Sequence, residues 1–277
     1  MTRLRLLFLA PARLLTFGFF LIPLGIIVLY SFSTRGTYGG QGMPFTWENY
    51  ARLFDPLYGT ILLRSFWLAG LATSICLLMG FPLALFIARS GQRRNLFLNL
   101  VMLPFWTSFL VRTYAWMFLL RDTGLVNTAL QSTGIITDPL PLLYNDAAVV
   151  LGLVYGYLPF MVLPIYGTVE RMDASLLEAA ADLGATPWVS LWKIVIPMAM
   201  PGIIAGAILV FIPCLGAYLT PDLMGGGKSI MVGNLVQNQF TNARDWPFGS
   251  ALSLVLTGMV MVLLWIAVKR GGDRLMG

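Results

Sequence analysis

Long apolar segments, separated by shorter polar ones, run along the whole chain. Six of them have the length, roughly 20 residues, that a helix needs to cross the hydrocarbon core of a bilayer. They lie at about 14–32, 65–88, 96–120, 147–169, 198–217 and 248–268. This pattern predicts an all-α integral membrane protein in which residues 1–277 form a single transmembrane domain of about six helices.

The first apolar segment could also be read as a secretory signal peptide. It lacks a small-residue cleavage site, and Tyr30-Ser31-Phe32 follows a segment of full spanning length. We therefore expect a retained membrane anchor.

The placement of lysine and arginine predicts the orientation, because the cytoplasmic segments of membrane proteins are enriched in these residues. With both termini in the cytoplasm, the inner segments hold Arg3, Arg5, Arg13, Arg89, Arg93, Arg94, Arg171, Lys193, Lys269, Arg270 and Arg274. The outer segments hold Arg35, Arg52, Arg64, Arg121, Lys228 and Arg244. Arg112 is left within the third span, where we expect it to extend toward the interface or to pair with an outer-loop carboxylate.

The composition agrees with a lipid-embedded chain. Hydrophobic residues make up 58% of the positions and charged residues 11%, against about 25% charged residues in a typical soluble domain. The net charge of +6 follows from the inner-face bias, so we expect no nucleic-acid partner. There is no histidine, and Cys76 and Cys214 lie inside expected spans. We therefore expect neither a metal site nor a disulfide.

Prolines and glycines within the spans indicate where helices bend and where they pack closely. Pro159 and Pro164 share the fourth span, which is the strongest candidate for a distorted helix. Gly202 and Gly206 lie four residues apart in the fifth span, a spacing typical of close helix packing in membranes.

The segment between the fourth and fifth spans, about residues 171–197, is too polar to cross the bilayer and too rich in helix formers to be a plain loop. The residues that share one side at helical spacing are Leu176, Leu177, Ala180 and Ala181. Gly184 suits the end of a first helix, and Pro187 suits the first turn of a second. We expect a helix–turn–helix on the cytoplasmic face that presents a rigid projection to a soluble partner.

The same segment resembles the EAA motif of the binding-protein-dependent, MetI-like ABC permeases. Glu178-Ala179-Ala180, Gly184, Ile194 and Pro197 match the motif's spacing, and Ile196 replaces its leucine. The resemblance implies a MetI-like ABC importer permease fold, in which this loop docks into a groove on the ATPase subunit. The residues that it assigns to ATPase coupling are Glu178, Ala179, Ala180, Asp182, Leu183, Gly184 and Ala185.

From about residue 44 to residue 265 the chain is similar to the PotB-type permeases of spermidine/putrescine importers. The matching segments include Asp55-Pro56-Leu57-Tyr58, Pro104-Phe105-Trp106-Thr107, Met200-Pro201-Gly202 and Arg244-Asp245-Trp246-Pro247. The resemblance implies a multi-pass protein of the bacterial plasma (inner) membrane that translocates polyamines delivered by an external substrate-binding protein. It also implies an ATPase homodimer and a second, related permease that completes a heterodimer.

The run Gly225-Gly226-Gly227-Lys228-Ser229 ends like a nucleotide-binding loop. Thr220 stands where that motif requires its first glycine, no strand leads into the run, and the segment falls on the expected outer face, where ATP is absent. We therefore expect this chain to bind no cofactor and to be no enzyme, with ATP and Mg used by the partner ATPase.

A polyamine is a flexible polycation, so its path should offer carboxylates and aromatic rings, the latter through cation–π contacts of roughly 0.5–2 kcal/mol each. The residues that we assign to the path are Trp106, Tyr114, Tyr155, Tyr218, Asp222, Asp245 and Trp246. Each of them also fits an ordinary role as a solvated acid or an interfacial aromatic residue.

Two other classes of protein are weighed against the importer. A secondary transporter of small cations or amines without an ATPase partner would need a coupling-ion site, and none of the six expected spans contains an acidic residue. A membrane-embedded enzyme is disfavoured by the lack of histidine and of paired intramembrane carboxylates.

The lysine and arginine bias makes the topology testable. A reporter fused after Lys269 should behave as cytoplasmic, and a reporter inserted within residues 125–140 should behave as external, because short positively charged segments stay inside. Paired phosphatase and fluorescent-protein fusions measure both sides. The opposite pattern would overturn the orientation.

Overall fold

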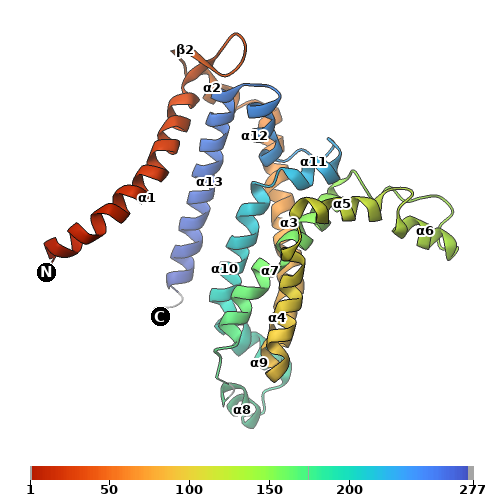
Figure 1. Cartoon of the computed structure of the whole chain (residues 1–277). Helices are drawn as coiled ribbons and strands as arrows, with labels where there is room; N and C mark the ends of the chain where they lie inside the picture. The colour runs from red at the N-terminus through yellow and green to blue at the C-terminus, as the bar shows by residue number, and fades with distance from the viewer. Residues whose placement is uncertain (1, 174, 274–277) are drawn as a thin grey trace. The chain divides into compact units, whose positions relative to one another are not determined.

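The structure is a computed structural model that describes residues 2–173 and 175–273, and it divides into two compact units. The first unit comprises Met1–Thr60 and Leu235–Val262, and the second comprises Ile61–Asn234 and Leu263–Gly277. Each is described by itself below (Figure 1).

The first unit joins a long apolar helix to a small hairpin. Its elements are α1 (Thr2–Ser31), β1 (Ser33–Arg35), β2 (Gln41–Phe45), α2 (Glu48–Arg52) and most of α12 (Val232–Thr241) and α13 (Trp246–Asp273). The two strands are antiparallel, with Ser33 opposite Phe45. Buried Asn49 donates from Nδ2 to the carbonyl oxygens of Ser31 at 2.9 Å and Ser33 at 2.8 Å. One amide side chain therefore ties α2 to the point where α1 passes into the hairpin.

The second unit holds most of the remaining helices. They are α3 (Pro56–Arg89), η1 (Gly91–Arg93), α4 (Arg94–Met102), η2 (Leu103–Trp106), α5 (Phe109–Leu120), α6 (Leu125–Ser132), α7 (Asp146–Val169), α8 (Ser175–Asp182), α9 (Pro187–Ser190), η3 (Leu191–Val195), α10 (Ile196–Leu215) and α11 (Leu219–Gly225). Of the short elements, η1 and η2 are 3₁₀ turns and η3 is a π turn.

The α7 and α10 helices pack closely at the centre of this unit (Figure 1). The contact depends on residues without side chains, as the spacing of Gly202 and Gly206 predicts. A Cβ atom on Gly202 would lie 2.6 Å from the carbonyl oxygen of Pro164, and one on Gly206 would lie 3.1 Å from that of Met161. Small residues let membrane helices approach until their backbones touch, which gains dispersion contacts that lipid cannot supply.

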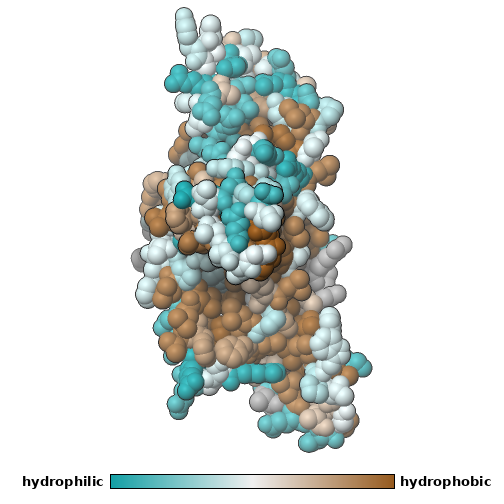
Figure 2. Space-filling model, turned by 90° about the vertical axis from the view of Figure 1, so that its right-hand side faces the viewer, coloured by the Kyte–Doolittle hydropathy of each residue, from teal (hydrophilic) through white to brown (hydrophobic). Residues whose placement is uncertain are grey.

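Among the described residues, four helices are long and apolar enough to cross a membrane: Pro56–Arg89, Asp146–Val169, Pro187–Leu215 and Trp246–Ala267. A bent pair of helices makes a fifth if the pair is counted as one span, and Leu15–Ser31 is a shorter apolar helix. The expected count of six spans is therefore approximate. On the face shown in Figure 2, hydrophobic side chains form a broad zone, and hydrophilic ones gather at the upper end and, more sparsely, at the lower end, where Figure 1 places α8.

The third expected span, about 96–120, is not one straight helix. The segments Gly91–Trp106 and Phe109–Ser132 meet at an angle of 88°. Thr107 and Ser108 between them are extended, with ψ of 151° and 139°. Pro104 cannot donate a backbone hydrogen bond, and the Thr107 hydroxyl donates to the Pro104 carbonyl oxygen at 2.8 Å, which closes the first helix.

The fourth span, predicted to be distorted at Pro159 and Pro164, continues through both prolines as one α-helix without a break. Each proline lacks the N–H that would bond to the carbonyl group four residues earlier, which is that of Tyr155 or Phe160. One turn beyond the second proline, the Thr168 hydroxyl donates to the Pro164 carbonyl oxygen at 2.9 Å.

The glycine contact between α7 and α10 generates a stability prediction. Replacing Gly202 with valine should destabilise the folded chain by about 1–3 kcal/mol, because the new side chain meets backbone atoms that cannot move aside. Gly70→Ala on α3 is the matched control, since nothing lies within 4 Å of the added Cβ. Thermal unfolding in detergent should show a lower Tm for Gly202→Val alone. Equal Tm values for the two variants would contradict the packing argument.

Candidate functional site

The first candidate site is the EAA loop, residues 171–197, and its first helix is α8. The Asp173 carboxylate accepts a hydrogen bond from the Ser175 backbone N–H at 3.0 Å at the start of the helix. This bond holds the pKa of Asp173 below its ordinary value, because it favours the charged form. Ala180 is buried, whereas Glu178 and Asp182 are exposed. The helix thus presents its acidic residues outward.

The turn after α8 is closed by Gly184. Gly184 has φ of +80°, and its N–H donates to the Ala181 carbonyl oxygen at 2.9 Å. The Ala185 N–H donates to the Ala180 carbonyl oxygen, also at 2.9 Å. These two bonds form a Schellman motif, which satisfies the last carbonyl groups of the helix and requires a left-handed residue at the glycine position. The predicted turn at Gly184 is therefore confirmed.

The second helix of the loop differs from the separate short helix that we expected. The Thr186 hydroxyl caps α9 by accepting from the Val189 N–H at 3.4 Å, and Pro187 occupies the first turn. The chain then continues without a break through η3 into α10. Pro197 has no N–H to donate to the carbonyl oxygen of residue 193. The π turn just before it is wider than an α-helical turn and accommodates the lost hydrogen bond. A movement of the turn is thus transmitted directly to α10.

Large apolar side chains stand exposed at the tip of the EAA loop. Leu183 is 89% exposed, and Trp188 and Trp192 are 67% and 56% exposed, with their rings edge to face at 6.0 Å. Sequence reasoning missed the two tryptophans, although their i, i+4 spacing would have placed them on one helix face. Exposed apolar groups on a polar loop are typical of a surface that a partner covers.

An ion pair links the base of the EAA loop to α4. Arg94 Nη1 lies 2.6 Å from Glu170 Oε1, at the residue that ends α7. Arg94 is the first residue of α4. Because the two residues are 76 positions apart, this pairing could not be predicted from the sequence.

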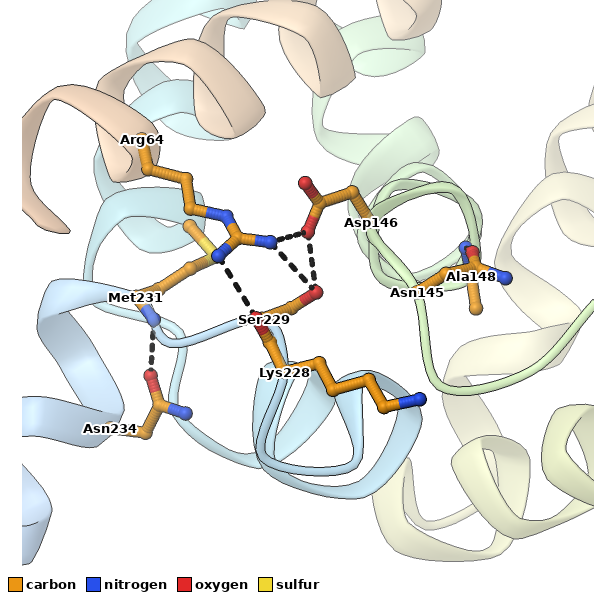
Figure 3. A network of polar contacts seen from close by, with 8 residues as sticks. All are labelled: Arg64, Asn145, Asp146, Ala148, Lys228, Ser229, Met231 and Asn234. Carbon is orange, nitrogen blue, oxygen red and sulfur yellow. Dashed lines mark hydrogen bonds and ion pairs between the residues drawn. The ribbon is translucent and has the colours of Figure 1, made fainter. Parts of the chain in front are cut away.

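The second candidate site is the Arg64 cluster, formed by Arg64, Asp146 and Ser229 (Figure 3). Arg64 Nη2 lies 2.6 Å from Asp146 Oδ1, which also accepts a short hydrogen bond from the Ser229 hydroxyl. Arg64 Nη1 donates to the Lys228 carbonyl oxygen at 2.9 Å, while the Lys228 side chain extends away from the carboxylate. The cluster therefore joins α3, the start of α7 and the glycine-rich run that resembled a nucleotide-binding loop.

Five of the residues assigned to the substrate path lie in the second unit. They are Trp106, Tyr114, Tyr155, Tyr218 and Asp222. Trp106 is 79% exposed in η2, Tyr114 is 55% exposed on α5, and Tyr155 packs edge to face on Trp116 at 5.5 Å. The Asp222 carboxylate is exposed in the first turn of α11, where its charge suits the helix dipole. These side chains come from several different elements and form no single cluster.

The other two residues assigned to the path, Asp245 and Trp246, lie in the first unit and have structural partners. Asp245 is 3% exposed, and its Oδ2 lies 2.8 Å from Arg52 Nη1. Its Oδ1 accepts from the Phe248 N–H at 3.2 Å and so caps α13. The Trp246 ring stacks on Tyr30 at 6.1 Å. Both carboxylate oxygens of Asp245 are therefore engaged within its own unit, unlike the exposed Asp222.

Apolar helices of spanning length, with an EAA loop projecting from a polar end, define a membrane permease. The chain belongs to the family of binding-protein-dependent transport system inner membrane components, whose pattern matches residues 80–270. This membership favours the importer over the secondary transporter that the sequence left as an alternative.

Relatives of known name cover nearly the whole chain. The spermidine/putrescine transport system permease protein PotB of Escherichia coli is 44% identical over 255 residues, which are 91% of this chain and 93% of that protein. PotB of Haemophilus influenzae is 43% identical over 90% of this chain and 87% of that protein. The inner membrane ABC transporter permease protein YdcU of Escherichia coli is 36% identical over 82% of this chain and 76% of that protein.

Solved structures confirm the expected MetI-like fold. A chain of a bacterial ABC transporter involved in the import of the polysaccharide alginate has a TM-score of 0.80 at 17% identity, covering 98% of this chain and 95% of that chain. A chain of the MetNI methionine ABC transporter has a TM-score of 0.59 at 16% identity, covering 80% and 98%. At these identities the likeness shows the fold alone.

The left-handed turn of the EAA loop generates a prediction that separates backbone conformation from bulk. No atom lies within 4 Å of a Cβ on Gly184, so space is free and only φ opposes a substitution. Gly184→Val should disturb the turn by about 1–2 kcal/mol and lower ATPase co-purification or coupled uptake several-fold. Gly184→Asn is the matched control and should stay near native, because asparagine tolerates this conformation. Native docking and uptake in Gly184→Val would remove the turn from the coupling element.

Proposed function

We propose that this chain is the permease subunit of an ATP-driven importer of polyamines, either spermidine or putrescine or both. The observation that carries the proposal is the 44% identity over 91% of the chain to permeases named for spermidine/putrescine transport. The similarity extends over both units and includes the loops as well as the apolar helices, which supports a shared class of substrate.

The chemistry of the exposed residues suits a cation that passes without being held. Asp222 offers a carboxylate in α11, and Tyr218 just before it is 45% exposed and offers a ring face. Single cation–π contacts contribute roughly 0.5–1 kcal/mol at exposed sites. An external binding protein supplies the affinity, so weak sites along the permease favour release. Asp245 has a structural role in this proposal, because Arg52 neutralises it.

The EAA loop supports the assignment of ATP hydrolysis to a separate subunit. In the proposed assembly an ATPase homodimer binds ATP and Mg, and this chain binds neither. Leu183 and the exposed face of α8 enter a groove of the ATPase, and both chain termini lie on that cytoplasmic side. Closure of the ATPase dimer moves the loop, and the continuous α9–η3–α10 segment carries the movement into the membrane. A second, related permease completes the pathway.

Uptake by the whole complex tests the proposal. The chain, its ATPase, the second permease and the binding protein are placed in proteoliposomes with labelled putrescine or spermidine. We expect ATP-dependent accumulation of at least one polyamine, competed by the unlabelled amine and not by an anion such as sulfate. A complex that hydrolyses ATP in response to its binding protein but accumulates neither amine would overturn the polyamine assignment.

A further inference from the structure

Arg94 and Glu170 hold together the ends of two helices of the second unit. Arg94 is the first residue of α4, and Glu170 is the cap residue that follows α7. Arg94 Nη1 lies 2.6 Å from Glu170 Oε1. Both backbones are fixed, because Arg94 has helical φ and ψ and the Glu170 N–H donates to the Tyr166 carbonyl oxygen at 2.8 Å. The ion pair therefore sets the start of α4 beside the end of α7.

Each charge of this pair has the wrong sign for its own helix. The start of a helix carries partial positive charge and favours an anion, whereas the end carries partial negative charge and favours a cation. Arg94 is a cation at the start of α4, and Glu170 is an anion at the end of α7. Each side chain suits the end of the other helix, to which the ion pair brings it. The arrangement thus stabilises the contact between the two helices and neither helix alone.

The start of α4 has few other attachments. None of the nine residues of α4 is buried in the part of the chain that the structure describes. Phe97 lies against Phe86 near the end of α3, with ring centres 5.0 Å apart, but this contact joins α4 only to the helix just before it. Among the described residues, the ion pair with Glu170 is the polar side-chain contact that joins α4 to α7.

The pair contributes more to position than to stability. The Arg94 and Glu170 side chains are 49% and 33% exposed, and solvent-exposed ion pairs add little to the free energy of unfolding. Glu170 lies directly before the EAA loop, and α4 leads through η2 to the bend at Thr107 and Ser108. A displacement of the loop at Glu170 is therefore passed to the bent pair of helices at Arg94.

We propose that Arg94 is a positioning residue that couples the EAA loop to the bent pair of helices, so that a displacement of the loop by the ATPase moves α4 as well as α10. This inference rests on the proposed function, which supplies the ATPase. Without the ion pair, the loop keeps its turn at Gly184 and its continuous path into α10. The ATPase then docks and hydrolyses ATP, but less of the movement reaches α4, and less substrate is imported for each ATP.

Charge variants in the complete complex test this role. Arg94→Gln should lower polyamine uptake per ATP hydrolysed roughly two- to fivefold, the range that the loss of one exposed ion pair allows. Co-purification of the ATPase and the Tm of the complex should stay near native. Arg94→Lys should retain the native ratio, because a single nitrogen makes the contact. Arg93→Gln is the matched control, since it removes the same charge from the neighbouring position, and Arg93 forms no ion pair with any described residue.

Exchanging the two charges separates pairing from net charge. The double variant Arg94→Glu, Glu170→Arg should restore the native ratio of uptake to hydrolysis, whereas Glu170→Arg alone should lower it. A native ratio in Arg94→Gln overturns the inference, and so does an equal fall in Arg93→Gln. A loss of ATPase docking or a lower Tm in Arg94→Gln also overturns it, because the pair would then support the fold and not the position of α4.

A distance measurement makes the inference independent of the substrate. Spin labels on cysteines introduced at exposed Leu100 of α4 and exposed Arg171 of the EAA loop report the separation of these elements, and the native Cys76 and Cys214 are buried. With Arg94 in place the separation should be unchanged by ATP, whereas in Arg94→Gln it should shift or broaden. Identical distributions in both proteins overturn the coupling role. A complex that shows this difference but imports no polyamine would instead overturn the substrate assignment alone.

Discussion

A backbone amide inside a bilayer has no water to bond, and the arrangement of this chain follows from that constraint. Where the chain is an α-helix, its backbone groups bond to one another within the segment. The two prolines of α7 remove the donors for the carbonyl groups four residues earlier, and the helix nevertheless continues through both. Among the described residues, one pair of apolar helices is bent by 88°, and the break lies at Thr107 and Ser108, where the backbone is extended.

Within the membrane, close backbone contact and not the hydrophobic effect holds the spanning helices together. Lipid tails are as apolar as leucine, so burying apolar area inside a bundle gains little by itself. The contact of α7 with α10 is made instead by two glycines that admit backbone carbonyl oxygens to within about van der Waals distance. The helix that carries the EAA loop into the membrane is thus held against the most buried helix of its unit.

This packing gives the proposed mechanism its physical basis. A Schellman turn fixes the direction of α8, and an uninterrupted helical path leads from Pro187 through η3 into α10. The Arg94–Glu170 pair ties the other end of the loop to α4. A partner that moves the loop would therefore move α10 and α4 together. The 88° bend lies in the segment that follows α4.

What the sequence predicts and what only the tertiary structure decides differ for a physical reason. Local properties could be predicted from the sequence. The length of the apolar segments predicted the spanning helices, and Gly184 with Pro187 predicted the turn of the EAA loop. Each of these depends on a residue and its near neighbours. The sequence could not separate Asp222 from Asp245, because what distinguishes them is Arg52, 193 positions from Asp245.

In the same way, proline alone did not reveal which span breaks. Pro159 and Pro164 lie within a continuous α-helix, while Pro104 lies in the 3₁₀ turn that ends just before the 88° bend. The Arg64 cluster and the Arg94–Glu170 pair likewise join residues 82 and 76 positions apart. Charge pairing and backbone hydrogen bonding act through space, so only the folded chain decides which polar groups are neutralised.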